Sequence, residues 1–445
     1  MSCVLLSAWE KTLRRHSDNR AVTQATDGHS VTFRELDVRA TAWLATHAPD
    51  PRALAGRAVV FAVPNGIRWF EIFLGLLRAG AVAVPLDAAE PVAAQRRIAE
   101  ALRAGFWWDG ARLTSLPNPR RFRAPAVCLI KLTSGTTGQP HPLIFTAAQF
   151  LADAQQVTAT MGIRPRDLNY ALIPLGHSYG LGNLTGPLLA HGVPLVCGAS
   201  PLPHAIAADF ARWRPTVFPG VPAMWRALAA SEVALESLRL GISAGAPLPA
   251  EVARDFATRF GRKLHSFYGS SETGGIAYDP TGAATLTGSV GSALRGVALS
   301  RQRGQRLRVS SAAVFTHGNR HRGKMSGAWI MADRVTLDPR GRVTLLGRRG
   351  RAIKLAGRRV DLSEIVTCLC RLPGVRDAWV GVSCGADPVL GTVIATERAV
   401  GELRSLLHQA LAPWKVPRKW LTVYSLPITA RGKMDGRATQ ALLFR

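Results

Sequence analysis

The sequence has 445 residues, 47% of them hydrophobic and 28 of them proline, which is typical of a globular protein too long for a single core. Six cysteines lack zinc-type spacing, no apolar run is long enough to span a bilayer, and the N-terminus reaches charged residues too early for a signal peptide. We therefore expect a cytoplasmic protein with reduced thiols and without a membrane span.

The formal net charge of +27 at pH 7 is unevenly spread. Residues 295–359 hold 17 Lys and Arg against two Asp. Such a block suits nucleic acid, a membrane surface or an acidic protein, and it is equally compatible with a solvated basic surface. Because the arginines alternate with Gly and apolar residues, we consider nucleic acid the less favoured partner.

The first hundred residues predict strands that alternate with helices. Thr32 followed by Glu35 has the pattern of a capping box at a helix start. Apolar strands are expected at 57–64 and 81–87, with one helix between them and another at 93–104. This alternation predicts a mostly parallel sheet covered by helices on both faces.

Residues 126–140 join an apolar strand, 126–132, to the polar loop Thr133-Ser134-Gly135-Thr136-Thr137-Gly138. Successive backbone N–H groups in such a turn can form an anion-binding nest, with hydroxyls beside it. No Lys-Ser or Lys-Thr pair follows the second glycine, so the loop is not a Walker A motif. The pattern indicates a phosphate loop, and an ordinary polar turn is the alternative.

Gly176-His-Ser-Tyr-Gly180 follows a predicted strand and matches the G-x-S-x-G pattern. That is the context of a hydrolase nucleophile elbow, with Ser178 as the nucleophile. No HGGG-type oxyanion segment precedes it, and the motif leaves most of the chain unexplained. An α/β-hydrolase is therefore kept as an alternative function, beside a basic nucleic-acid-binding protein.

Three later strands, ending near 220, 243 and 268, each run into a turn of small residues. In open α/β sheets ligands bind at such carboxyl ends of strands. The third turn carries Glu272 and Thr273. A single carboxylate near a phosphate loop suggests a Mg²⁺ ligand, because Mg²⁺ is usually held by one or two carboxylates plus phosphates.

Near Gly347 the composition changes, and Gly350 is suited to act as a hinge. We predict an α/β fold with a large N-terminal domain, residues 1–349, built on doubly covered, mostly parallel sheets. A small, mobile α+β domain, residues 350–445, is expected to follow it.

Together these segments resemble the adenylate-forming superfamily of acyl-CoA synthetases, aryl-acid ligases, peptide-synthetase adenylation domains and luciferases. The resemblance covers nearly the whole chain and rests on ordered motifs: 132–140, 268–273, 288–291, Asp333, 347–360 and 426–437. It implies that a carboxylate attacks the α-phosphorus of ATP, pyrophosphate leaves, and a pantetheine thiol then takes the acyl group from the adenylate.

The resemblance assigns roles to individual residues. Glu272, which would bind Mg²⁺, Lys433, which would bridge the reacting oxygens, and His177 are implied as catalytic residues. ATP is expected to be bound by Thr133, Ser134, Gly135, Thr136, Thr137, Gly138, Tyr268, Gly269, Thr273, Asp333 and Arg348. The acid pocket is expected to be formed by His177, Phe218, Gly220, Ser243, Gly245, Ala246, Tyr268 and Ser270.

Small residues beside two aromatic ones favour a flat acid of the hydroxybenzoate kind, and no clear acidic residue is available to hold a substrate amino group. The basic block flanks the hinge and favours an acidic acyl carrier protein over CoA as the acceptor. His141-Pro142 replaces the family's usual Lys-Gly, a departure that bears on ATP affinity, and Gly350 replaces the Asp or Lys that is common as the first hinge residue.

Overall fold

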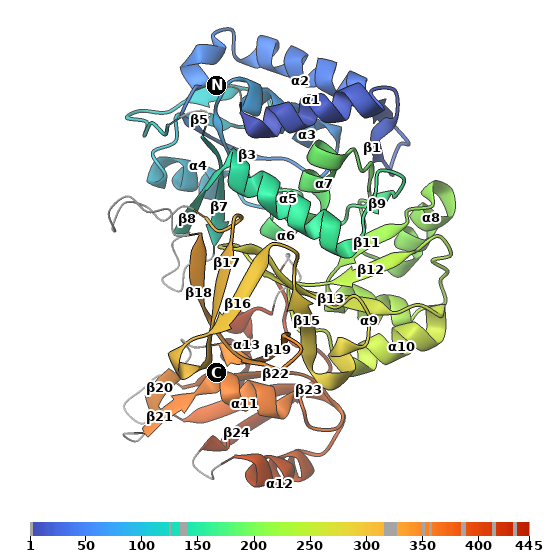
Figure 1. Ribbon diagram of the computed structural model, residues 1–445. Coiled ribbons are helices and arrows are strands. Elements are labelled where there is room, and N and C mark those ends of the chain that lie inside the picture. The colour runs from blue at the N-terminus through green and yellow to red at the C-terminus, as the bar shows by residue number, and fades with distance from the viewer. Residues whose placement is uncertain are drawn as a thin grey trace. The chain divides into compact units, whose positions relative to one another are not determined.

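The computed structural model describes residues 3–123, 126–133, 141–315, 327–348, 352–355, 358–383, 389–411, 415–429 and 434–444; at 133, 348, 352–355 and 358–361 it describes the backbone alone. The chain divides into two compact units (Figure 1). Unit 1 comprises Met1–Leu299 and Val309–Trp329, and unit 2 comprises Ser300–Arg308 and Ile330–Arg445. The predicted domain boundary at the Gly350 hinge lies outside the described residues and stays a prediction.

Unit 1 contains the longer helices and two sheets. Its helices are α1 Val4–His16, α2 Phe33–His47, η1 Pro51–Leu54, α3 Ile67–Arg78, α4 Val92–Ala101, α5 Ala147–Met161, α6 Ser178–Gly180, η2 Leu181–Thr185, α7 Gly186–His191, α8 Pro203–Trp213, α9 Pro222–Ala229, α10 Ala250–Phe260 and η3 Ala284–Thr287. Its strands are β1 Arg20–Gln24, β2 Ser30–Thr32, β3 Ala58–Ala62, β4 Val82–Leu86, β5 Phe106–Trp108, β6 Leu113–Ser115, β7 Val127–Thr133, β8 His141–Thr146, β9 Asn169–Tyr170, β10 Leu195–Cys197, β11 Val217–Gly220, β12 Leu240–Ser243, β13 Leu264–Ser270, β14 Gly274–Tyr278 and β15 Ser289–Ala293. Strands β16 Val297–Arg301 and β17 Arg306–Ser311 contribute residues to both units.

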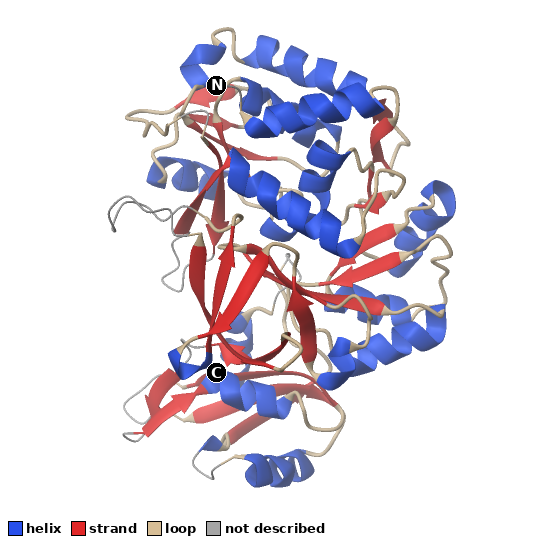
Figure 2. Cartoon of the chain, viewed as in Figure 1, coloured by secondary structure: helices blue, strands red, loops and turns tan. Residues whose placement is uncertain are grey.

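One sheet of unit 1 has the strand order β6-β5-β3-β4-β7-β8, in which β5, β3, β4 and β7 are parallel. In the other, β13, β12, β11, β9, β10 and β1 are neighbours in that order and run parallel to one another. Helices α8, α9 and α10 lie along β11–β13 (Figure 2). The predicted parallel, helix-covered architecture is thereby confirmed.

Local sequence explains where several of these elements begin and end. The Thr32 hydroxyl accepts a hydrogen bond from the Glu35 N–H, and the Glu35 carboxylate accepts one from Thr32, which confirms the predicted capping box at α2. The apolar run at 126–132 forms β7, which pairs with β8 so that Thr133 lies opposite His141. The predicted phosphate loop thus connects two strands of one hairpin.

Unit 2 is a smaller α+β unit. Beside η4 Arg303–Gln305 it contains β18 Ala328–Leu337, most of which belongs to this unit, β19 Arg342–Arg348, β20 Ala352–Leu355, β21 Arg358–Asp361, α11 Leu362–Leu369, β22 Val375–Val382, β23 Leu390–Thr396, α12 Val400–Ala410, β24 Lys419–Val423 and α13 Gly436–Leu443. Strands β22, β23 and β24 form one sheet, and α11 and α12 contribute Ile365, Leu403 and Leu407 to its core. The predicted α+β character is confirmed.

Among the helices of the described ranges, none combines the length and the apolar character that a bilayer crossing requires. Within the same ranges no group of three or more His, Cys, Asp or Glu side chains is placed to hold a metal ion. Cys3, Cys128, Cys197, Cys368 and Cys370 are free thiols.

Candidate active site

The carboxyl ends of β11, β12 and β13 bring the predicted acid-pocket residues to one edge of the sheet. Gly220 is in register with Ser243, and Ser243 with Ser266. Tyr268 and Ser270 continue β13 beyond that point and are half-buried. Gly245, with φ of +87°, and Ala246 form the exposed turn after β12. This edge of the sheet therefore combines an exposed turn with half-buried and buried side chains that could line a pocket.

Two of these wall residues have distinct environments. The Ser243 side chain is only 2% exposed, and within the described part of the chain its hydroxyl has no hydrogen-bond partner. A buried hydroxyl without a partner is costly, and a ligand or water that hydrogen-bonds to it removes that cost. Phe218, in contrast, is fully buried, and its ring centroid lies 4.8 Å from that of Trp225 and 5.1 Å from that of Tyr170. This placement favours a core role for Phe218 over the predicted pocket wall.

His177 stands at the N-cap of α6, where its Nδ1 accepts a hydrogen bond from the Tyr179 N–H at 3.3 Å. In a neutral imidazole this leaves the proton on Nε2, which can then donate to a ligand. Gly180 permits the tight turn, because a Cβ there would lie 2.1 Å from the Pro174 carbonyl oxygen. The G-x-S-x-G pattern therefore has a steric basis that needs no nucleophile.

Asn65 fixes the loop that leads to His177. Its amide nitrogen donates to the carbonyls of Ala171 at 3.2 Å and Ile173 at 2.9 Å, and its Oδ1 accepts from the Leu175 N–H at 2.9 Å. Asn65 belongs to none of the motifs described above. Its position between Pro64 and Gly66, shortly after the buried strand β3, is the feature of the sequence that could have marked it.

Tyr179 is a second residue that the motif reading passed over. Its hydroxyl, in a buried setting, lies 3.3 Å from the Gly220 carbonyl oxygen and 3.2 Å from that of Ile242. Burial raises the pKa of Tyr179 well above its ordinary value, so the group remains a neutral donor. It ties the short helix after His177 to the ends of β11 and β12.

The turn between β13 and β14 carries Glu272 and Thr273. Thr273 is fully buried, and its hydroxyl lies 3.0 Å from Ser270 Oγ. The Glu272 carbonyl accepts a hydrogen bond from the Phe315 N–H at 2.9 Å, while the residue itself is half-buried. A half-buried carboxylate at a sheet edge suits a Mg²⁺ ion that shares its other ligands with phosphates and water.

In unit 2, Asp333 and Arg348 are backbone partners in the antiparallel pair β18–β19. The structure thus places these two predicted ATP-binding residues on neighbouring strands. Ser134, Gly135, Thr136, Thr137, Gly138, Gly350 and Lys433 lie outside the described residues, so their predicted roles stay predictions. His141, at the start of β8, is exposed.

Ser178, the nucleophile of the alternative hydrolase, donates a hydrogen bond to Ser271 Oγ at 2.9 Å. A serine nucleophile needs a general base within hydrogen-bond reach. Another serine cannot serve as that base. The contact instead joins the helix after His177 to the turn that carries Glu272.

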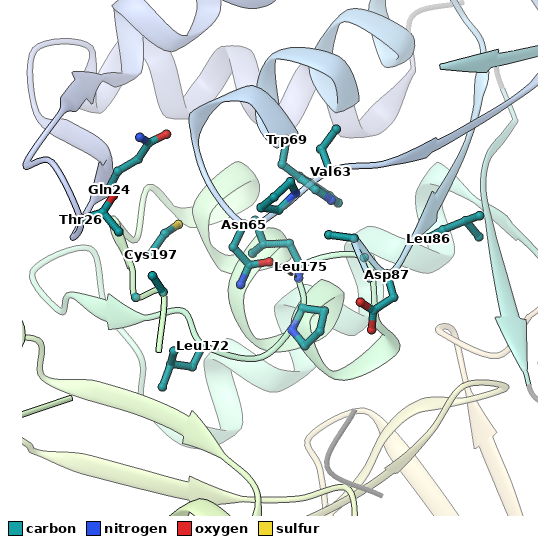
Figure 3. A pocket seen from close by; sticks show the side chains of 16 residues that line it. Gln24, Thr26, Val63, Asn65, Trp69, Leu86, Asp87, Leu172, Leu175 and Cys197 are labelled. Atoms are coloured by element: carbon teal, nitrogen blue, oxygen red, sulfur yellow. Dashed lines mark hydrogen bonds between the residues drawn. The ribbon is translucent and has the colours of Figure 1, made fainter. Parts of the chain in front are cut away.

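A cavity of about 460 Å³ lies behind the His177 loop (Figure 3). Its walls include Gln24, Asn65, Trp69, Asp87 and Leu175. None of the eight predicted pocket residues is among its lining residues in the described chain. It nevertheless borders the His177 loop, because Pro174, Leu175 and Gly176 line it.

The parallel, helix-covered sheets and the small α+β unit agree with the fold expected from the resemblance to the adenylate-forming superfamily. The family described as AMP-binding enzyme matches residues 9–108 and 106–300. The chain belongs to this family.

Relatives agree with this assignment. The chain is similar to the 4-hydroxybenzoate–CoA/benzoate–CoA ligase of Rhodopseudomonas palustris, with 26% identity over 335 residues, which are 68% of this chain and 62% of that relative. It thus spans less than two thirds of that protein's length. A feruloyl-CoA synthase of Amycolatopsis sp is 26% identical over 457 residues, with 92% and 93% covered. The crystal structure of ATP-bound MatB from Rhodopseudomonas palustris shares the fold with a TM-score of 0.81, 22% identity and 98% of each chain covered.

Proposed function

We propose that the protein is an AMP-forming acid–thiol ligase. A carboxylate oxygen of the acid attacks the α-phosphorus of ATP, the bond to the β-phosphate oxygen breaks, and pyrophosphate leaves. A pantetheine thiolate then attacks the acyl carbon of the adenylate, and AMP leaves as the acyl–oxygen bond breaks. Membership of the AMP-binding enzyme family is the observation that carries this proposal.

Residues of both units have parts in this reaction. His177 and the ends of β11 and β12 hold the acid, and Glu272 holds the Mg²⁺ that accompanies ATP. Thr273 and the loop 133–138 contact the phosphates, and Tyr268 and Gly269 lie along the nucleotide. In unit 2, Asp333 takes the ribose hydroxyls beside Arg348, and Lys433 stabilises charge that develops between carboxylate and phosphate. Gly350 acts as the hinge that lets Lys433 approach and withdraw.

For the acid, we favour an aromatic carboxylate that bears a hydroxyl group. The buried, unpaired Ser243 hydroxyl supports this choice, since it offers a polar contact to a hydroxyl group of the acid. The names of two relatives, for 4-hydroxybenzoate/benzoate and for ferulate, are in keeping with it.

Two assays test whether the substrate is a hydroxylated aromatic acid. Pyrophosphate release should be measured with ATP, Mg²⁺ and benzoates with and without hydroxyl groups, with amino acids as the comparison set. Ser243→Ala should raise KM about tenfold for a hydroxybenzoate that pairs with Ser243 and leave KM for benzoate unchanged, because only the former loses a hydrogen bond. Equal turnover of amino acids and benzoates would contradict the choice of acid.

For the thiol acceptor, we favour an acyl carrier protein, because exposed Arg301, Arg303, Arg308 and Arg340 give unit 2 positive surface charge that suits an acidic partner. CoA is the competing acceptor, as in the names of both relatives. Transfer to a carrier protein should fall steeply with added salt, whereas transfer to CoA should change less. If transfer to the carrier protein and transfer to CoA had equal rates and neither changed with salt, the preference for a carrier protein would be contradicted.

Pyrophosphate release decides the proposal as a whole. A panel of carboxylic acids that yields none, together with labelling of Ser178 by a fluorophosphonate, would favour a hydrolase. Salt-dependent DNA binding without pyrophosphate release would favour a nucleic-acid-binding protein.

A further inference from the structure

Helix α5 begins directly after β8, the strand that leaves the predicted phosphate loop. Thr146 caps the helix: its hydroxyl accepts a hydrogen bond from the Gln149 N–H at 3.2 Å, and the side-chain oxygen of Gln149 accepts one from the Thr146 N–H at 2.8 Å. This reciprocal pair is a capping box, in which glutamate serves as well as glutamine. The cap therefore needs only the oxygen of the Gln149 side chain.

The amide nitrogen of Gln149 makes a second, long-range contact. It donates to the Val314 carbonyl at 2.6 Å, and Gln149 is 6% and Val314 1% exposed. The next residue, Phe315, donates its N–H to the Glu272 carbonyl at 2.9 Å. One buried amide thus joins the end of β8 to the segment that holds Glu272, although 165 positions separate Gln149 from Val314.

Asp153 lies one helical turn after Gln149, on the same side of α5. Its side chain is 4% exposed, and its Oδ1 accepts a hydrogen bond from the Gly275 N–H at 2.9 Å. Gly274 has φ of +70°, and a Cβ there would overlap the same oxygen. The Asp153 carboxylate therefore fills the space against the backbone that directly follows the Glu272 turn.

We infer that Gln149 and Asp153 are positioning residues that hold the Glu272 turn from both sides. Gln149 acts through Val314 and Phe315 on the carbonyl of Glu272, and Asp153 acts on the backbone that follows the turn. Because the Gln149 side chain also caps α5 at the end of β8, it ties this turn to the hairpin of the predicted phosphate loop. The consequence for ATP binding rests on the proposed function; the hold on the turn does not.

Four variants of the full chain separate this role from helix capping. Gln149→Glu keeps the oxygen that caps α5 but replaces the donor to the Val314 carbonyl by a carboxylate oxygen. Gln149→Ala loses both contacts, and Asp153→Ala loses the acceptor for the Gly275 N–H. Glu35→Gln, at the exposed capping box of α2, is the matched control, because it exchanges the same two side chains at another cap.

Hydrogen–deuterium exchange at pH 8 is the first readout, and it needs no nucleotide. Gln149→Glu should speed exchange about tenfold at 271–278 and at 311–315 but leave the start of α5 as in the wild type, because the cap survives. Gln149→Ala should speed exchange at all three places, Asp153→Ala mainly at 271–278, and Glu35→Gln at none of them. Unchanged exchange at 271–278 in Gln149→Glu or in Asp153→Ala would overturn the inference. Equally faster exchange throughout unit 1 would show a general loss of stability and would overturn it as well.

The second readout is the pyrophosphate assay. Gln149→Glu should raise KM for ATP about ten- to hundredfold while KM for the acid stays within about twofold, since it is the phosphate side of the site that moves. An equal rise in both KM values would contradict the positioning role. If the wild type releases no pyrophosphate with any acid, the proposed function fails, and the exchange result still decides whether Gln149 and Asp153 hold the turn.

Discussion

Asn65 offers a sharp test of how the His177 loop is held. Its side chain makes three hydrogen bonds to a loop more than 100 residues away in sequence. Each such bond contributes about 0.5–1.5 kcal/mol net, and because Asn65 is half-buried, water can replace part of the loss. Asn65→Ala should therefore lower the free energy of unfolding by about 2–3 kcal/mol.

Asn65→Asp makes the prediction more specific. Aspartate keeps the oxygen that accepts from the Leu175 N–H, but it places a second acceptor against the carbonyl oxygens of Ala171 and Ile173. At pH 7 this replaces two hydrogen bonds by two repulsive contacts, so the near-isosteric Asp should be less stable than Ala by about 1–2 kcal/mol. Asn19→Ala, at an exposed asparagine, should change stability by only about 0.5 kcal/mol.

Urea unfolding followed by tryptophan fluorescence gives the stability order, and the pyrophosphate assay gives KM for the acid. The expected order is wild type, then Ala, then Asp, with KM for the acid raised in both variants because His177 is displaced. An Asp variant more stable than the Ala variant would refute the hydrogen-bond directions at this loop. Unchanged KM would refute the link from Asn65 to His177.

Three further outcomes follow from the same reasoning. Lys433→Ala should slow adenylation from acid and ATP about a hundred- to thousandfold and spare thioester formation from a preformed acyl-adenylate; equal loss of both steps would contradict the two-orientation mechanism. Burial opposes ionisation of Asp167, but hydrogen bonds, led by that from Arg239, hold the pKa of Asp167 below its ordinary value. The ionised Asp167 therefore stabilises the fold above about pH 4, and this stabilisation is lost at lower pH. Arg239→Met should accordingly cost about 1–2 kcal/mol at pH 7, after allowance for the half-exposed arginine, and much less at pH 2, as urea unfolding at the two pH values would show. Ser178→Ala should retain pyrophosphate release within about tenfold, since it loses one hydrogen bond to Ser271; full loss with intact folding would restore the nucleophile hypothesis.

Local sequence patterns predicted local structure well. The capping box at Thr32 and strand β7 each depend on residues within a few positions of one another. The strand ends at Gly220 and Ser243 were also predictable, because parallel strands bring their carboxyl ends to one edge.

Long-range contacts account for what the sequence did not reveal. Asn65 reads as a loop asparagine until the fold places the loop at 171–175 against it. Asp153 gives no sign of a special role in the sequence, because its carboxylate meets the Gly275 N–H only once the chain has folded. Phe218 was taken as a pocket wall on its position alone, and the rings of Trp225 and Tyr170, which come from other elements, surround it instead.

The two supporting systems meet at a single described hydrogen bond. Asn65 fixes the loop and helix on the acid side, and Asp153 fixes the turn on the phosphate side. The bond between Ser178 and Ser271, at 2.9 Å, connects them. Groups that share a hydrogen-bond network show coupled mutational effects, whereas distant independent groups show additive ones. The hydroxyl that first suggests a nucleophile thus joins the helix after His177 to the turn that carries Glu272, the parts that hold the acid and the phosphates in the proposed function.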